Sequence, residues 1–285
     1  MLKSPPFKIW GLTTLALLAF AGNSILCRYA LKEGAIDAAS FSTVRLLAGA
    51  IFLFILVSFK NKPQSYLAQG SWTGAIWLFI YAASFSFAYI SLDTGIGALI
   101  LFGAVQVTMI LVSLIQGKHL SRFEWMGLIT AFGGLLVLLL PGAGAPSLWG
   151  FGLMALSGIA WGLYSLSGRG SSDPLLTTAG NFYRTIPLII VLTMITFNQA
   201  HITTEGLVLA IVTGAITSGL GYAIWYAALK NLQISQASIV QLSVPIIAAL
   251  GGVVISQETI SVQLLLSSLL VLGGLILFML GKKSA

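Results

Sequence analysis

The sequence predicts an all-α membrane protein of ten transmembrane helices, arranged as two inverted five-helix repeats around a central cavity. Three observations support this fold class: the composition, ten apolar windows of bilayer length, and an internal repeat. Of the 285 residues, 58% are hydrophobic and only 7% are charged, whereas a soluble domain carries about 25% charged residues. Such a chain cannot cover itself with groups that favour water, so its outer surface must contact lipid.

About twenty apolar residues are enough to cross a bilayer as a helix. Charged or Gly/Pro-rich breaks divide the chain into ten windows near this length, joined by connections too short to hold a soluble domain. The first window is long and lacks a clean cleavage site, so it is expected to be a retained span and not a signal peptide. The predicted spans are 9–29, 38–58, 72–91, 97–116, 124–140, 148–167, 176–198, 206–229, 234–255 and 261–281.

The basic residues predict the orientation of these spans. Ten of the 14 fall in connections on one side of the membrane, two fall on the other side, and Arg45 and Arg184 lie inside spans. The positive-inside rule therefore predicts a multi-pass protein of the inner (plasma) membrane with both termini in the cytoplasm. The ten residues are Lys3, Lys8, Lys60, Lys62, Lys118, Arg122, Arg169, Lys230, Lys282 and Lys283.

The two halves of the chain repeat each other weakly. A displacement of 140 residues places Gly133-Gly134 on Gly273-Gly274, and a displacement of 139 places Arg45 on Arg184. With five spans in each half, the halves must enter the membrane in opposite orientations. Inverted repeats of this kind are typical of secondary transporters, whose solute site lies between the halves near the midplane.

The stretch Gln236–Glu258, which covers most of the ninth window, contains Pro245 near its middle and Gly251-Gly252 after it. Proline removes a backbone donor and crowds the preceding turn. In lipid, that defect is tolerated where neighbouring helices or a wet cavity satisfy the freed carbonyl. The window is therefore expected to be a bent or loosened helix facing the interior, with Pro245, Gly251 and Gly252 as gating residues.

A family resemblance follows from these landmarks. The Gly-Asn pair of the first span, the arginine early in the second (STVRLLAGA), and Pro245 and Glu258 followed by Gly273-Gly274 resemble EamA-type transporters of the drug/metabolite transporter superfamily. The resemblance implies one repeat in residues 1–142 and another in 143–285, around a cavity that opens alternately to each side. Members carry amino acids, amines, nucleotide-sugars or other metabolites, often outward. The first half departs from the pattern, since Val105 and Lys118 occupy the places of Pro245 and Glu258.

Arg45 and Arg184 are the most costly residues in the predicted spans, because a charge at the membrane centre costs about 2.5–3.5 kcal/mol on insertion scales. Either arginine could bind a carboxylate or phosphate through its planar guanidinium. Either could instead hold backbone carbonyls of neighbouring helices. Asn181 shares a helical face with Arg184, just before Pro187.

Other polar and aromatic residues at depth are candidates to line the cavity. Asn23 either bonds the solute or ties the first span to a neighbour, and the aromatic residues either stack on a solute or only pack. Tyr81 offers a hydroxyl at mid-span, and Gln106 and Gln241 are polar at depth. The candidate solute-binding residues are Asn23, Arg45, Tyr81, Gln106, Trp161, Tyr164, Asn181, Arg184, Tyr222, Trp225 and Gln241.

The sequence lacks the residues that several kinds of chemistry require. No Asp, Glu or His falls in a span interior, so no proton relay is evident, and Glu258 is expected to cap or pair at a helix end. No His/Cys/Asp cluster has metal-ligand spacing, and no GxxxxGK[ST] loop is present to bind ATP. Neither a cofactor nor an enzymatic activity is expected.

These observations predict a secondary transporter of a small organic metabolite, such as an amino acid-like solute or an amine, that works by alternating access. Two intramembrane arginines without intramembrane carboxylates favour a zwitterionic or anionic solute. A nucleotide-sugar or phosphometabolite exchanger is the alternative within this class, and a membrane-embedded enzyme or a non-transporting receptor is the alternative outside it. The expected partners are the solute and membrane lipid, not nucleic acid, and the sequence leaves monomer and homodimer open.

Overall fold

The computed structural model describes residues 6–59, 69–117, 120–140, 145–232, 237 and 240–281. These residues are helical apart from turns and short connections, and their β structure is one isolated bridge between Ile36 and Ile202. Seven of the described helical stretches are long and apolar enough to cross a membrane, and Ser243–Ser256 is a shorter apolar helix. The chain is a multi-pass membrane protein.

The helices follow the ten predicted windows within a few residues. The seventh window is divided into α7 and α8, and the eighth into α9, η2 and α10, while residues 234–236, 238 and 239 of the ninth window lie outside the described residues. Seven of the basic residues used to predict the orientation are also affected: Lys3, Lys60, Lys62, Lys118, Lys282 and Lys283 lie outside the described residues, and the side chain of Lys8 is not described. The elements are α1 (Pro6–Lys32), α2 (Ala38–Phe59), α3 (Trp72–Tyr89), α4 (Thr94–Ile115), α5 (Arg122–Leu138), α6 (Leu148–Gly168), α7 (Pro174–Arg184), α8 (Ile186–Thr196), η1 (Phe197–Gln199), α9 (Thr204–Val212), η2 (Thr213–Leu220), α10 (Gly221–Leu229), α12 (Ser243–Ser256) and α13 (Val262–Gly281).

Local capping residues set several of these boundaries. Ser71, Ser147 and Asp173 each accept a backbone N–H from the first turn of the helix that follows. Ser121 and Glu124 form a reciprocal capping box at the start of α5, which satisfies two backbone donors at once. The polar residues between apolar windows thus start helices, and Glu124 lies at a helix end as predicted.

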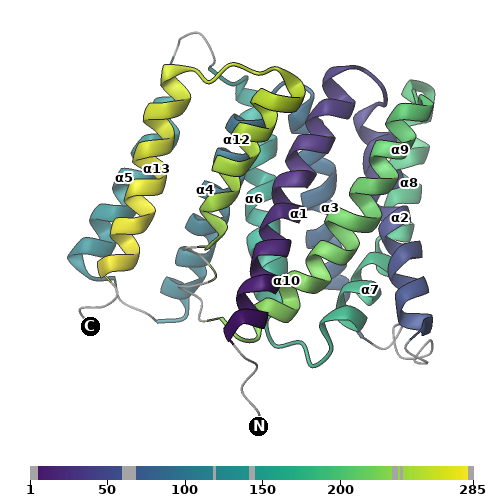
Figure 1. The fold of residues 1–285 in the computed structure, drawn as a ribbon, viewed down its shortest axis with the longest axis horizontal. Helices are drawn as coiled ribbons and strands as arrows, with labels where there is room; N and C mark the ends of the chain where they lie inside the picture. Colours follow the sequence, from purple (N-terminus) through teal and green to yellow (C-terminus); the bar gives the residue numbers. More distant parts are fainter. Residues whose placement is uncertain are drawn as a thin grey trace.

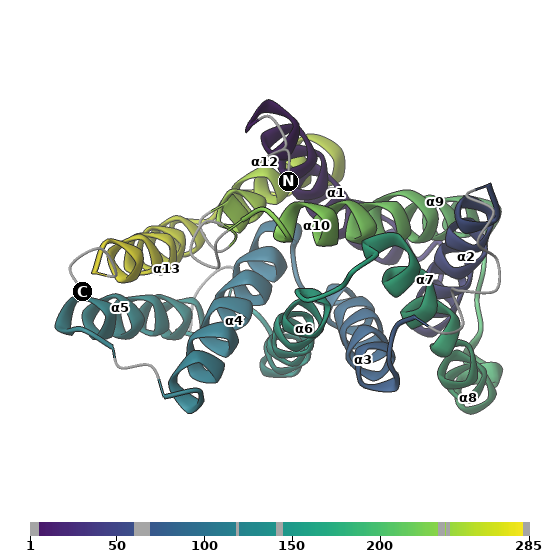
Figure 2. The same cartoon turned by 90° about the horizontal axis from the view of Figure 1, so that it is seen from below.

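The helices form two facing rows (Figure 2), with α4, α6 and α3 in one row and α12, α1, α10 and α9 in the other. Helices α5 and α13 pack on each other at one end of the bundle, and α2 packs with α7 and α8 at the other end. Within the rows, α6 contacts α3 and α4, while α1 contacts η2, α10 and α12. Helix α1 begins and α13 ends at the same face of the bundle (Figure 1), which we call the inner face.

Glycine allows α5 and α13 to approach closely. A Cβ added to Gly274 would lie 2.5 Å from the backbone nitrogen of Ala131, and one added to Gly134 would lie 2.8 Å from that of Val271. The neighbouring Gly133 and Gly273 face open space, with no atom within 4 Å. Because lipid offers no hydrophobic drive for helix association, small residues that permit close backbone contact supply much of the attraction.

At the face of the bundle opposite the inner face, which we call the outer face, Asp37 ties two connections together. Its carboxylate accepts the backbone N–H of Ser40 at 2.9 Å, which caps α2, and that of His201 at 2.8 Å. Partial burial acts to raise the pKa of Asp37, but the hydrogen bonds outweigh it and the pKa is lowered. The connection before α2 is thereby fastened to the connection before α9.

We expect Gly274→Ala to destabilise the protein by about 1–3 kcal/mol, because the added methyl group overpacks the α5–α13 contact. Gly273→Ala, one residue away and facing open space, is the matched control and should leave stability unchanged or slightly raised. Thermal unfolding of the purified protein in detergent measures both. Equal melting temperatures for the two variants would contradict the packing role of Gly274.

We expect Asp37→Asn to cost about 1 kcal/mol at neutral pH, since the amide nitrogen cannot accept the His201 N–H. The folded pKa of Asp37 lies below its unfolded value of about 3.9. Its stabilising effect is therefore present above that pH and is lost as the pH falls through the folded pKa. The difference in melting temperature between wild type and variant should shrink below about pH 4. Glu33→Gln, which removes an exposed outer carboxylate, should show no such convergence.

Candidate functional site

A buried arginine lies at the centre of the helix bundle. Arg45 of α2 has no exposed surface. Its Nε donates to Ser218 Oγ at 2.8 Å, and its Nη2 donates to the hydroxyls of Tyr222 at 2.7 Å and Tyr81 at 3.1 Å. The guanidinium also lies 5.3 Å from the ring centroid of Tyr81 and 5.0 Å from that of Phe85, within range of cation–π attraction. Three helices thus hold one cation with neutral groups.

The π-helix η2 connects this arginine to α1. Asn23 Nδ2 donates to the carbonyl of Thr217 at 3.1 Å, and the hydroxyls of Thr217 and Ser218 donate to Asn23 Oδ1 at 2.7 and 3.0 Å. A Cβ on Gly214 would collide with the carbonyl of Arg45, so glycine permits η2 to lie against α2. π-helical turns often occur at functional sites, and this one directs Thr217 and Ser218 inward.

Aromatic rings from both halves of the chain surround the polar network. The ring centroid of Trp161 lies 4.6 Å from that of Tyr222, 4.9 Å from that of Tyr81 and 5.2 Å from that of Phe20. Trp225 packs edge-on against Phe20 at 5.4 Å. All five side chains are buried. We call this set, with Asn23, Arg45, Phe85, Thr217 and Ser218, the central cluster.

The central cluster contains six of the eleven residues predicted to bind the solute: Asn23, Arg45, Tyr81, Trp161, Tyr222 and Trp225. Tyr164 lies at its edge, with its ring 5.5 Å from Trp161 and 5.2 Å from Tyr226. Sequence reasoning missed Phe20, Phe85, Thr217 and Ser218. A polar Thr-Ser pair between glycines in an apolar window was the signal available for the last two.

The structure places Asn181 and Arg184 against the backbone at the start of α3. Arg184 Nη1 donates to the carbonyls of Gln69 at 2.7 Å and Gly180 at 2.9 Å. Asn181 Oδ1 accepts the N–H of Ser71 at 2.8 Å. In this structure Arg184 holds backbone carbonyls, which is the second of the two roles that the sequence left open.

The remaining two polar candidates belong to α4 and the ninth window. Gln106 is buried in α4. Gln241 is buried, and its Nε2 donates to the carbonyl of Ala237 at 3.1 Å. The amide nitrogen of Gln241 therefore bonds within its own window, whereas the hydroxyls that hold Arg45 come from other elements.

The predicted interruption of the ninth window lies just before Pro245. The helix breaks at a turn at Leu242, and α12 starts at Ser243. Gly251 and Gly252 face neighbouring elements, since a Cβ on Gly251 would meet Ile25 and one on Gly252 would meet Thr94 and Glu258. These glycines let the outer end of α12 approach α1 and α4.

Above the central cluster, an ion-pair network joins three elements at the outer face. Arg28 of α1 donates to Glu258 at 3.2 Å and to Asp93 at 2.9 Å. Glu258 also accepts the backbone N–H of Thr94 at 2.8 Å, at the start of α4. We call Arg28, Asp93, Thr94 and Glu258 the outer clamp. The prediction that Glu258 caps or pairs at a helix end is confirmed, and its partner Arg28 lies within α1.

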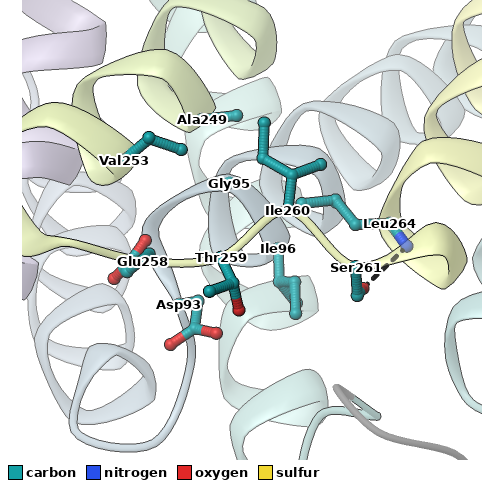
Figure 3. Close-up of a pocket in the computed structure, with 10 residues that line it drawn as sticks. All are labelled: Asp93, Gly95, Ile96, Ala249, Val253, Glu258, Thr259, Ile260, Ser261 and Leu264. Atoms are coloured by element: carbon teal, nitrogen blue, oxygen red, sulfur yellow. Dashed lines mark hydrogen bonds between the residues drawn. The ribbon is translucent and has the colours of Figure 1, made fainter.

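A pocket of about 350 Å³ lies beside the outer clamp, between α4, α12 and the start of α13. The carboxylates of Asp93 and Glu258 lie at one end, and Ile96, Ile260 and Leu264 lie toward the other (Figure 3). Among the described residues no three His, Cys, Asp or Glu side chains gather as a metal site would require.

Comparisons with known proteins identify the family and the fold of the chain. Residues 148–280 match the model of the EamA-like transporter family. The chain is 51% identical to the uncharacterized protein PA1977 of Pseudomonas aeruginosa, over 94% of this chain and 93% of that protein. It is 22% identical to an uncharacterized transporter of Archaeoglobus fulgidus, over 80% and 83% of the two chains, and 20% identical to the uncharacterized transporter YoaV of Bacillus subtilis, over 82% and 85%. A crystal structure of a protein with 16% identity shares the fold, with a TM-score of 0.68 over 99% of both chains.

We expect Arg28→Ala to destabilise the protein by about 3–5 kcal/mol, because it leaves the buried carboxylate of Glu258 without its cation. The double variant Arg28→Ala/Glu258→Ala should cost less than the sum of the two single variants, as contacting residues do. Arg169→Ala, which removes an exposed arginine, is the control. Additive effects in thermal unfolding would show that the pair does not couple.

Proposed function

Because the chain belongs to the EamA-like transporter family, we propose that it is a secondary transporter that moves a small organic metabolite across the inner membrane by alternating access. The metabolite is amino acid-like, an amine or a related solute, and the physiological direction is export. One observation carries the proposal: a buried polar and aromatic cluster is built from both halves of the chain, directly below an ion-pair network at the outer face. A solute site between two moving halves requires this arrangement.

The packing of the helices supports two inverted repeats, residues 1–142 and 143–285. In the predicted repeat, exchanging the halves maps α6 onto α1, α3 onto the span that ends in α10, and α4 onto α12. Helix α6 contacts α3 and α4, and α1 contacts α10 and α12, so both sets of corresponding contacts are present. The same exchange maps α5 onto α13, which pack on each other through the equivalent glycines Gly134 and Gly274. Helices related in this way can rock as two bodies around a fixed centre.

The outer clamp supports an occluded outer side in this conformation. Opening that side requires α1 and α12 to separate, and therefore requires Arg28 to leave Glu258. The break at Leu242 and Pro245 offers a place where the outer part of α12 can tilt without moving the rest of the ninth span. On this mechanism, Pro245, Gly251 and Gly252 control the opening, and the first half supplies no equivalent hinge at Val105.

The termini are proposed to face the cytoplasm. Helix α1 begins and α13 ends at the same face (Figure 1), and ten of the 14 basic residues fall in connections assigned to that side by sequence. The outer clamp and its pocket then face the opposite compartment.

Flux measurements test the function itself. Purified protein in liposomes should show counterflow of at least one labelled solute among amino acids, amines, organic acids and nucleotide-sugars, above the rate in protein-free liposomes. Absence of flux for every class would reject the proposed function.

Accessibility of a buried residue tests the mechanism. Ser24 lies one turn below Arg28 on α1 and is fully buried, so Ser24→Cys in a Cys27→Ser background places one thiol beneath the outer clamp. A membrane-impermeant thiol reagent added from the outer side should label it slowly. Glu258→Gln should accelerate labelling about tenfold or more, because it weakens the clamp by at least about 1.4 kcal/mol.

Glu205→Gln, which changes an exposed carboxylate at the start of α9, is the control and should leave the labelling rate unchanged. Labelling at one rate in all three backgrounds would show that the outer clamp does not control access from this side.

A further inference from the structure

Arg45 is a buried cation that the protein does not neutralise. All seven Asp and Glu residues of the chain lie within the described residues, at helix ends or in connections. None forms an ion pair with Arg45, and the two ion pairs found among the described residues both belong to Arg28. A guanidinium stays protonated in proteins, and removing a charge from water costs several kcal/mol when no opposite charge compensates.

Three buried hydrogen-bond donors of the central cluster have no acceptor among the described residues. Nη1 of Arg45 is buried and has no acceptor, and the same holds for the indole Nε1 of Trp161 and of Trp225. These groups can only donate. The Trp161 ring lies against Tyr81 and Tyr222, the two residues whose hydroxyls accept from Arg45. A ligand that satisfies this cluster must supply acceptor oxygens.

Charge balance narrows the kind of ligand. A monoanion makes the site neutral, while a zwitterion leaves a net charge of +1 and brings an ammonium group for which no carboxylate is present. A dianion such as a phosphate monoester leaves −1 and calls for a second cation. The other intramembrane arginine, Arg184, holds the carbonyls of Gln69 and Gly180 instead.

The walls of the cluster fit an apolar, flat body. The rings of Phe20, Tyr81, Trp161, Tyr222 and Trp225 touch one another in this conformation, with centroids separated by 4.6 to 6.1 Å. A bound ring would replace some of these contacts with equivalent ones, at small cost in stacking energy.

We propose that Arg45 binds the carboxylate of an organic monoanion with an aromatic or similar apolar body, and that the transporter selects such monocarboxylates over zwitterions and cations. The inference rests on the proposed transport function and, at the same site, replaces the amino acid-like or amine solute named there with an organic monocarboxylate. Trp161 Nε1 is the second donor to the carboxylate.

A series of probes that share a phenyl ring and differ in charge tests this selection. The series is 3-phenylpropanoate (anion), phenylalanine (zwitterion), 2-phenylethylamine (cation) and 3-phenylpropanamide (neutral), with sodium chloride against sucrose of equal osmolarity to detect an inorganic anion site. Binding is measured on purified wild-type protein by quenching of tryptophan fluorescence and by thermal shift. We expect 3-phenylpropanoate to bind at least about tenfold more tightly than each of the other three, because an uncompensated charge in the site costs more than about 1.4 kcal/mol.

Variants assign the selection to Arg45. Arg45→Gln should reduce the ratio of anion affinity to amide affinity to about one, while Arg184→Gln should leave that ratio as in wild type. Trp161→Phe keeps the ring and removes the donor, and it should weaken anion binding about tenfold, the usual value of a hydrogen bond to a charged group. Trp149→Phe, at an exposed tryptophan, is its control. The wild-type series decides the charge class even if Arg45→Gln does not fold.

Equal or tighter binding of phenylalanine or 2-phenylethylamine would overturn the inference, as would stabilisation by chloride without binding of 3-phenylpropanoate. Unchanged anion binding in Trp161→Phe would show that the indole of Trp161 does not donate to the carboxylate. Counterflow of labelled 3-phenylpropanoate at pH 8, against protein-free liposomes, separates this inference from the proposed function. Flux of another solute class without monocarboxylate flux rejects only the inference, whereas no flux of any class rejects both.

Discussion

The structure depends on keeping one positive charge in the middle of a membrane protein. The guanidinium of Arg45 contacts hydroxyl groups from α3, η2 and α10 and the faces of two aromatic rings. Each contact is weaker than an ion pair, so several must act together and their positions must be fixed. The helices that contribute them come from both halves of the chain, and the charge therefore couples the position of one half to that of the other.

The local irregularities of the fold serve this centre. The π-helical turn Thr213–Leu220 holds Thr217 and Ser218 where both hydroxyls reach Asn23 Oδ1. Gly214 removes the side chain that would otherwise separate η2 from α2. The Asn23 side chain then accepts hydrogen bonds from the hydroxyls of Thr217 and Ser218 and donates hydrogen bonds to the carbonyl of Thr217 and the hydroxyl of Tyr222. Backbone distortion and small residues are thus concentrated where polar groups must meet at depth.

The sequence predicted the fold well because apolar windows, capping residues and glycine pairs are local signals. Helix ends, the buried positions of Asn23 and Tyr222, and the pairing of Glu258 follow from length, composition and the cost of exposed polar groups in lipid. The π-helix could not be predicted, because it depends on what η2 packs against and not on its own residues. Phe20 and Phe85 were missed for the same reason, because a phenylalanine in an apolar window gives the same sequence pattern whether its ring faces a guanidinium, another helix or lipid.

The three arginines that face the protein interior show what sequence alone cannot distinguish. Arg28 is neutralised by two carboxylates, and Arg184 is held by backbone carbonyls. Arg45 has neither, although its place in the predicted repeat is equivalent to that of Arg184. Carboxylates and carbonyls of the protein itself satisfy those two arginines in this conformation, so both arginines stabilise it. Hydroxyl and ring contacts leave part of the charge uncompensated, and a residue kept in that condition is suited to a partner that arrives and leaves.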